Sequence, residues 1–545
     1  MRRKSVIWIT ILIMLALVTG ACKAKPAPGK TPGNTSGPTP AQQTQLSVHV
    51  GSEPDIIDPA LNSAADVATM LLHTFEGLMT LDKNGTPIYG QAESHTVSAD
   101  GLTYTFKLRE GLKWSDGKPL TANDFVWSWN RAVNPETAAD YEYMFESIEG
   151  YAENKLNVTA PDERTLIVKL VAPTPYFLEL CAFPTFFPVR QDVVEANPDT
   201  WTLNPSTYIG NGPYVLQEWT HDSQMVYKKN PNYWKASAIT GPDTLRFLLM
   251  SDDNAILAAF RNEEILFADS MPNDEIDAWR NKPEFNLEGQ LGTYYVSFNV
   301  KKAPLDNPLV RKALLLAVDR SYIVTNIGKA GQEPAGAFVP IGLTDADPAK
   351  EFRDVGGNYY DPSKEAYQAN LAEAKKALAD AGYPNGKGLP SIEYLYNEGT
   401  GHQLIGEALQ SMWKEIGVNV TLVPQEWNTF LTTRKNGEYQ IARNGWLADY
   451  NDPISFLDMW ITGSGNNDAQ WSNKDYDALI SKVKVSSDRN ERMQLMHQAE
   501  DIIFKDYMLC PIYYYVDIFL KSEKLQGFYS SPLGYKYFMY TTVKQ

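Results

Sequence analysis

Residues 403–450 read QLIGEALQSMWKEIGVNVTLVPQEWNTFLTTRKNGEYQIARNGWLADY, and this segment predicts an α/β fold. Apolar residues recur at helical spacing over 403–416 and again over 427–435, and a glycine closely follows each stretch. Residues 418–422 and 439–445 instead alternate apolar and polar side chains, which is typical of strands. Helices and strands in alternation build βαβ units, in which helices pack on a sheet.

The chain upstream of this segment predicts a region of hairpins. Thr121, with Asp124 three residues later, resembles a capping box and predicts the start of an amphipathic helix. An alternating run from Leu46 to Val50 predicts a first strand. Three turn dipeptides lie between further alternating runs: Asn84-Gly85, Asp100-Gly101 and Asp116-Gly117.

The N-terminus has the features of a secretory signal. Basic residues at positions 2–4 precede an apolar run over 6–18, and small residues lead to Cys22. This order predicts a signal peptide over 1–21 and acylation of Cys22, although Thr19 stands where lipoprotein signals usually have Leu. The alternative is an ordinary signal cut nearby. Residues 22–45 are rich in Pro, Gly, Thr and Ser, so beyond Cys22 we expect a disordered tether.

Composition narrows the class of protein. The net charge of −17 argues against binding to nucleic acid or to anionic lipid. After the tether about 500 residues remain, which is too many for one core, so two or three domains are expected. Aromatic residues make up 12% of the chain, which favours extensive interfaces or a ligand cleft lined by Trp and Tyr.

Cys181 and Cys510 are interpreted as buried free thiols, with a disulfide as the alternative.

Catalytic and metal-binding motifs are missing from the sequence. It contains no GxSxG, P-loop, HExxH or CxxC motif, and its six histidines are scattered without metal-ligand spacing. The prediction is therefore a protein that is not an enzyme and uses no metal or cofactor.

One βαβ region concentrates charged side chains. Arg443 shares strand parity with apolar Tyr439 and Ile441, and Asp449 follows the same strand, where α/β domains bind ligands. Two further cations lie on predicted helices, Arg434 near a C-terminal end and His402 near an N-terminal end. Each has a structural alternative as a cap, a turn residue or an ion-pair partner. Together they complement a zwitterion, with Asp449 for an ammonium and the cations for a carboxylate.

The chain resembles the extracytoplasmic oligopeptide-binding proteins of ABC importers, from about residue 46 to the C-terminus. The early motifs are typical of the wider peptide- and nickel-binding superfamily, solute-binding protein family 5, whereas the last motif, together with Arg434 and Arg443, is typical of its oligopeptide branch. The matching stretches are Gly51-Ser52-Glu53, Ile57-Asp58-Pro59, Phe75-Glu76-Gly77-Leu78, residues 98–104, 112–117, 210–214, 229–234 and 310–314, and Gly445-Trp446-Leu447-Ala448-Asp449-Tyr450.

The resemblance implies how a peptide is held. Asp449 would bind the α-ammonium group, and Arg443, Arg434 and His402 would receive the carboxylate, depending on peptide length. Backbone near Gly445 and Leu447 would pair with the peptide as an added strand. The full implied set is Asp449, Arg443, Arg434, His402, Glu53, Tyr141, Gly445, Leu447 and Trp446, with Glu53 on the early strand and Tyr141 reaching in from the second domain. Some relatives have a disulfide-bonded cysteine where Leu447 stands, so that bridge cannot form here.

The resemblance also implies a type II periplasmic-binding-protein fold, with two main lobes, an extra hairpin-rich domain and the ligand enclosed between lobes. Lobe I would comprise residues 46–66, 191–290 and 513–545, the extra domain 67–190, and the α/β lobe 291–512. The expected protein is monomeric and lipid-anchored on the extracytoplasmic face of the cell membrane, and it passes short peptides to the permease subunits of an importer. A binder of oligosaccharides and a receptor for signalling peptides are the alternatives; a secreted enzyme is disfavoured.

Overall fold

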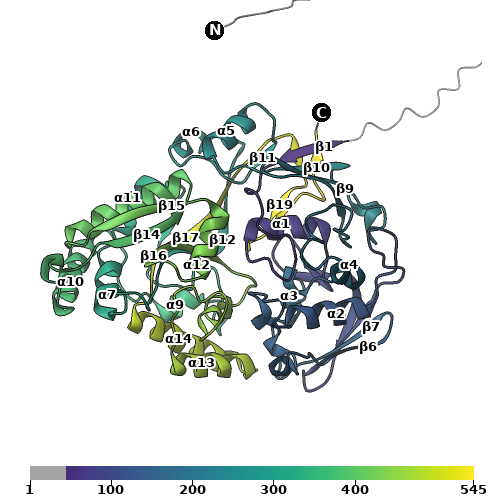
Figure 1. Ribbon diagram of the computed structural model, residues 1–545, viewed down its shortest axis with the longest axis horizontal. Coiled ribbons are helices and arrows are strands. Elements are labelled where there is room, and N and C mark those ends of the chain that lie inside the picture. The colour runs from purple at the N-terminus through teal and green to yellow at the C-terminus, as the bar shows by residue number, and fades with distance from the viewer. Residues whose placement is uncertain (1–43, 545) are drawn as a thin grey trace, which may run out of the picture. The chain divides into compact units, whose positions relative to one another are not determined.

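The structure, a computed structural model, describes residues 44–544 and is shown in Figure 1. Its largest sheet has seven strands and contains the α/β segment predicted above. The strand order is β11 (Phe267–Ala268), β17 (Leu509–Lys521), β12 (Phe285–Phe298), β16 (Ile441–Leu447), β14 (Ile392–Asn397) and β15 (Val420–Gln425), and β13 (Glu333–Pro334) pairs with β17. β14 runs parallel to β15 and β16, whereas β12 is antiparallel to both β16 and β17.

Two four-stranded sheets organise much of the remaining described chain. One has the order β1 (Gln45–Val48), β10 (Thr244–Leu248), β9 (Gln224–Lys229) and β8 (Tyr214–Thr220). The other is fully antiparallel, with the order β4 (Ala92–Val97), β5 (Thr103–Leu108), β7 (Thr165–Lys169) and β6 (Val158–Asp162). It lies within the predicted hairpin region, on the opposite side of Figure 1 from β14 and β15.

Helices cover these sheets. α11 (Thr400–Glu415) packs on β14 and β15, and its Trp413 ring lies edge-on to Tyr394 of β14. The Trp413 indole also donates to the carbonyl of Leu314 at 2.9 Å. The longer helices are α1 (Ala65–Thr74), α2 (Ala122–Ala132), α5 (Asp253–Arg261), α7 (Pro308–Leu316), α10 (Tyr367–Asp380), α11 (Thr400–Glu415), α12 (Trp427–Lys435), α13 (Lys474–Val485) and α14 (Arg489–Asp506).

Most local predictions agree with these elements. α12 has the predicted bounds, and the Thr121 N–H donates to Asp124 Oδ2 at 2.7 Å in the capping box before α2. Cys181 and Cys510 are both buried and free, which confirms the thiol interpretation. The strand predicted over 439–445 is shifted to β16, because pairing with β12 begins only at Ile441 and continues to Leu447.

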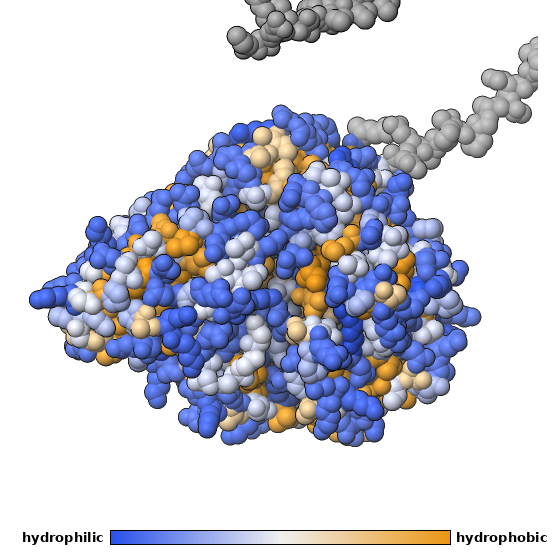
Figure 2. Space-filling view, in the orientation of Figure 1, coloured by the Kyte–Doolittle hydropathy of each residue, from blue (hydrophilic) through white to orange (hydrophobic). Residues whose placement is uncertain are grey.

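The signal peptide, Cys22 and all but the last two residues of the tether lie outside the described residues. No helix in the described part of the chain has the length and apolarity needed to cross a bilayer. Figure 2 shows polar residues over most of the visible face, with hydrophobic residues gathered in separate groups, as expected for a strongly acidic chain.

Candidate functional site

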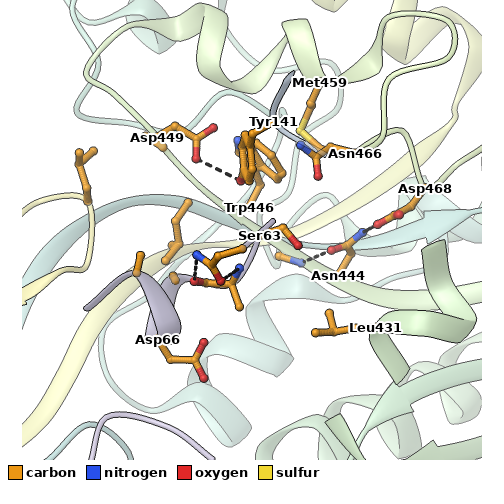
Figure 3. Close-up of a pocket in the computed structure, with 18 of the residues that line it drawn as sticks. Ser63, Asp66, Tyr141, Leu431, Asn444, Trp446, Asp449, Met459, Asn466 and Asp468 are labelled. Carbon is orange, nitrogen blue, oxygen red and sulfur yellow. Dashed lines mark hydrogen bonds between the residues drawn. The ribbon is translucent and has the colours of Figure 1, made fainter. Parts of the chain in front are cut away.

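A cavity of about 280 Å³ lies between the α/β segment and the N-terminal half of the chain; we call it the main cavity. β16 and the loop after it form one wall, and α12 contributes Arg434 and Lys435. The start of α1 contributes Asp66, and Tyr141 enters from the region of the hairpin sheet. Figure 3 shows Tyr141 and Asp449 pointing toward one another within this cavity.

Asp449 is a buried carboxylate without a cation. Its side chain is 8% exposed, and the Tyr141 hydroxyl donates to Oδ1 at 3.3 Å, while Oδ2 has no hydrogen-bond partner among the described residues. Burial, and then the nearby Asp458 carboxylate, raise the pKa of Asp449 well above its usual range. An unpaired buried charge is costly, so this site favours an incoming cation such as an ammonium group.

Arg443 is the complementary group. Its guanidinium lies over the Tyr294 ring at 5.1 Å and Nη2 is 3.4 Å from the Tyr515 hydroxyl. No carboxylate among the described residues forms an ion pair with it, and its Nε is buried without a partner. Arg443 is therefore available to an anionic ligand group.

Arg434 differs from Arg443 because it already has an anionic partner. Its Nε lies 2.7 Å from Asp468 Oδ2, and its Nη1 donates to Asn444 Oδ1 at 2.9 Å. The Asn444 amide in turn donates to Asp468 at 3.1 Å, as Figure 3 shows. Arg434 therefore closes one side of the main cavity as part of a neutralised network.

His402 lies beside the main cavity rather than in its wall. It lines an adjoining chamber, and its Nδ1 is 3.3 Å from the Tyr294 hydroxyl. Burial, and then the nearby Arg443 charge, lower the pKa of His402 well below its usual value. The ring is therefore neutral at pH 7 and offers a hydrogen bond rather than a charge.

β16 has a free edge in the cavity wall. β12 pairs with the whole strand, but β14 pairs with it only at Ile441 and Ala442. From Arg443 to Leu447, no strand among the described residues pairs with the second edge, and the Gly445 N–H is satisfied instead by Asn444 Oδ1 at 2.8 Å. A side chain at Gly445 would collide with the Tyr515 hydroxyl, so glycine at this position makes room for the Tyr515 side chain, which reaches across from β17.

The remaining predicted residues divide into two groups. Tyr141, Gly445, Trp446 and Leu447 all line the main cavity, as do Asp449, Arg443 and Arg434. Glu53 does not line it. It follows β1 instead of lying on the strand, and its carboxylate accepts hydrogen bonds from the Asp222 N–H at 2.9 Å and the His221 ring at 2.6 Å.

Sequence reasoning missed several wall residues. Asp468 and Asn466 lie in a loop with no periodic pattern, and Tyr515 reaches the cavity from β17, 72 residues beyond Arg443. Asn444 alternates with Arg443 on β16, so strand parity predicts that it faces the other side; its amide nevertheless reaches Arg434 at the cavity wall. Only Asn444 could have been predicted from the sequence, because it lies between Arg443 and Gly445, which were already assigned to the site.

A cavity between α/β and hairpin-rich parts, lined by a carboxylate and a guanidinium that have no ion-pair partner among the described residues, indicates a binding protein for a small charged ligand. A family model for bacterial extracellular solute-binding proteins, family 5 Middle, matches residues 86–468. The dipeptide-binding protein DppE of Bacillus subtilis (strain 168) is 34% identical over 545 residues, covering 98% of each chain. The chain therefore belongs to the family 5 bacterial extracellular solute-binding proteins, which are substrate-binding proteins for transport and not enzymes.

Solved structures confirm the predicted fold class. Haemophilus influenzae OppA in complex with RPPGFSPFR matches with a TM-score of 0.86 at 31% identity, covering 92% of this chain and 99% of that one. Escherichia coli MppA, a murein tripeptide binding protein, also reaches 0.86, at 30% identity over 93% and 99%. The unliganded open form of MppA reaches only 0.61, at 30% identity over 93% and 98%. This chain therefore superposes less closely on that open form than on the other two structures.

Proposed function

We propose that this protein binds short peptides outside the cytoplasm and delivers them to an ABC importer. The observation that carries the proposal is the free edge of β16, which lies between the unpaired Asp449 and the unpaired Arg443. A peptide is the ligand class that offers an ammonium group, a strand-forming backbone and a carboxylate together.

Strand addition explains how many peptides are accommodated. Main-chain hydrogen bonds are the same for every sequence, so they provide affinity without reading side chains. Asp449 and Arg443 are six residues apart, about 20 Å along an extended chain, and their side chains shorten the gap. We therefore infer short peptides, with low side-chain specificity where water fills the remaining space.

The roles within the site follow from the charges. Asp449 receives the ammonium group, and Tyr141 orients its carboxylate from the opposite wall. Arg443 receives the carboxylate, and neutral His402 adds a hydrogen bond. Because Arg434 is paired with Asp468, we assign it to holding the cavity wall rather than to receiving the carboxylate.

The anchoring and lobe assignments remain part of this proposal. Acylation of Cys22 would hold the monomeric protein at the extracytoplasmic face of the membrane, next to the permease subunits. The extra domain is supported by its own sheet, since β4 to β7 fall within 67–190. The seven-stranded sheet instead joins β11 and most of β17, assigned to lobe I, to the strands of the α/β lobe. Closure of the lobes would present a liganded form to the importer.

Two other ligands fit the family. An oligosaccharide would use the aromatic lining, but it needs neither Asp449 nor Arg443. A signalling peptide would use every residue assigned above, so a receptor role shares the same binding chemistry.

Native mass spectrometry tests the proposal directly. The protein is unfolded and refolded to remove bound ligand, then mixed with a library of free tripeptides to pentapeptides, or with the same library N-acetylated. Capture of the free library alone is the expected result, at micromolar or tighter affinity, about −8 kcal/mol or beyond. Capture of neither library by a refolded, cooperatively melting protein would overturn the peptide assignment.

A further inference from the structure

A second chamber of about 400 Å³ adjoins the main cavity; we call it the acidic chamber. The two spaces have five wall residues in common: Ala65, Asp66, Gln290, Leu447 and Tyr515. Because Leu447 belongs to β16 and Tyr515 to β17, the chamber opens beside the strand edge assigned to the peptide. A side chain of a ligand in the main cavity is therefore within reach of it.

Carboxylates dominate the walls of this chamber. Lys536 is the only Lys or Arg in its described lining, and its Nζ lies 3.2 Å from Asp269 Oδ1 and 2.8 Å from Asp517 Oδ2. His402 is neutral, as described above. The remaining carboxylates, which have no ion-pair partner among the described residues, are Asp66, Asp253 and Glu398.

Burial makes this excess of negative charge costly. Burial raises the pKa of Asp269 to about 8; the nearby Lys536 charge lowers this pKa, and the Asp517 carboxylate raises it further. Burial also raises the pKa of Asp66 to about 6. A cation that enters the chamber would offset both penalties.

Tyr513 provides an independent indication of a ligand. Its side chain is 8% exposed and lines the chamber, and its hydroxyl forms no hydrogen bond with any described residue. The ring is stacked on Tyr294 with centroids 4.9 Å apart, so its position is held by packing. A phenol hydroxyl without a partner in this wall can accept a hydrogen bond from an ammonium or guanidinium group, and its ring face also attracts cations.

We propose that the acidic chamber receives the cationic side chain of a lysine or arginine at the carboxyl-terminal position of the bound peptide. We assign the carboxyl-terminal residue of the peptide because the chamber walls include His402, at the carboxylate end of the site, but not Asp449, at the ammonium end. This inference rests on the proposed function, and it makes the site selective at one position while the others stay permissive.

Titration calorimetry with three tripeptides tests the inference. Ala-Ala-Lys and Lys-Ala-Ala carry the same charge, so general attraction to an acidic protein is equal for both, and Ala-Ala-norleucine replaces the ammonium by an apolar group of similar length. Ala-Ala-Lys is expected to bind about fivefold tighter than either of the others. The advantage should shrink in Asp253→Asn and Glu398→Gln, and persist in Glu110→Gln, an exposed carboxylate that does not line the chamber.

The outcomes separate the two proposals. If all three peptides bind with equal affinity, or if Lys-Ala-Ala gains as much as Ala-Ala-Lys, the chamber assignment is wrong and peptide binding stands. If none of the three binds, the peptide function fails and the chamber assignment fails with it.

Discussion

The Tyr141 hydroxyl donates to Asp449 Oδ1 at 3.3 Å, across the cavity and over 308 positions of sequence. Both residues are buried, at 6% and 8% exposure, so the hydrogen bond depends on the two walls being closed on each other. It therefore links Asp449, to which we assign the peptide ammonium group, to the contact between these two walls.

Removing this hydroxyl tests the link. Tyr141→Phe is expected to weaken peptide binding about three- to tenfold, because one hydrogen bond to the carboxylate is lost. Calorimetry with tri-alanine measures the change. Tyr143→Phe is the matched control: its hydroxyl is buried without a partner in the same segment, so affinity should stay within about twofold of wild type. Equal losses in both variants would mean that aromatic packing, not the hydrogen bond, matters.

The raised pKa of Asp449 predicts a pH dependence of stability. In the unfolded chain this carboxyl ionises near pH 4, whereas burial holds its folded pKa well higher. Between the two values the native state binds more protons than the unfolded state, so this group's contribution to the unfolding free energy falls as pH rises. Asp449→Asn removes the titration.

Ligand-free Asp449→Asn is accordingly expected to melt about 1–2 °C above wild type at pH 8, with a smaller difference at pH 5. Differential scanning calorimetry at both pH values makes the comparison. A variant that melts lower than wild type at pH 8 would show that the carboxylate has a cationic partner in the empty protein.

The Arg434–Asp468 pair predicts a stability defect. Arg434→Gln leaves the Asp468 carboxylate, 7% exposed, without its cation, and should lower the free energy of unfolding by about 3 kcal/mol. Urea unfolding measures the loss, and the double variant Arg434→Gln with Asp468→Asn should recover most of it. If Arg434→Gln is as stable as wild type but loses peptide affinity, Arg434 receives the peptide carboxylate and the structural assignment is wrong.

Arg443 should discriminate between peptide carboxylates and amides. Wild type is expected to bind tetra-alanine about tenfold tighter than its C-terminal amide, because a charge-assisted hydrogen bond is lost with the carboxylate. Arg443→Gln should abolish that preference while leaving affinity for the amide nearly unchanged. Fluorescence competition with both peptides gives the four affinities. If the variant still prefers the free carboxylate over the amide, a residue other than Arg443 receives the peptide carboxylate.

Much of this site could be predicted from sequence because its parts are local. The helix over 427–435 and the strand before Asp449 follow from residue spacing, and they bring Arg443 and Asp449 to one wall. The neutralisation of Arg434 could not be predicted, because Asp468 comes from a loop without periodicity. The acidic chamber was equally hidden, since its walls combine Tyr513 and Asp517 of β17 with Asp66 and Thr69, which are more than 440 positions earlier in the sequence.

In the proposed complex, Asp449 anchors the α-ammonium group of a peptide lying along β16. The most direct measurement is the dissociation constant of tetra-alanine, free and N-acetylated, for wild type and for Asp449→Asn by calorimetry at pH 7. The free peptide is expected to bind wild type at micromolar or tighter affinity, and at least about 30-fold more weakly when either the ammonium or the carboxylate is removed. Equal affinity of wild type for free and N-acetylated tetra-alanine would contradict this role of Asp449.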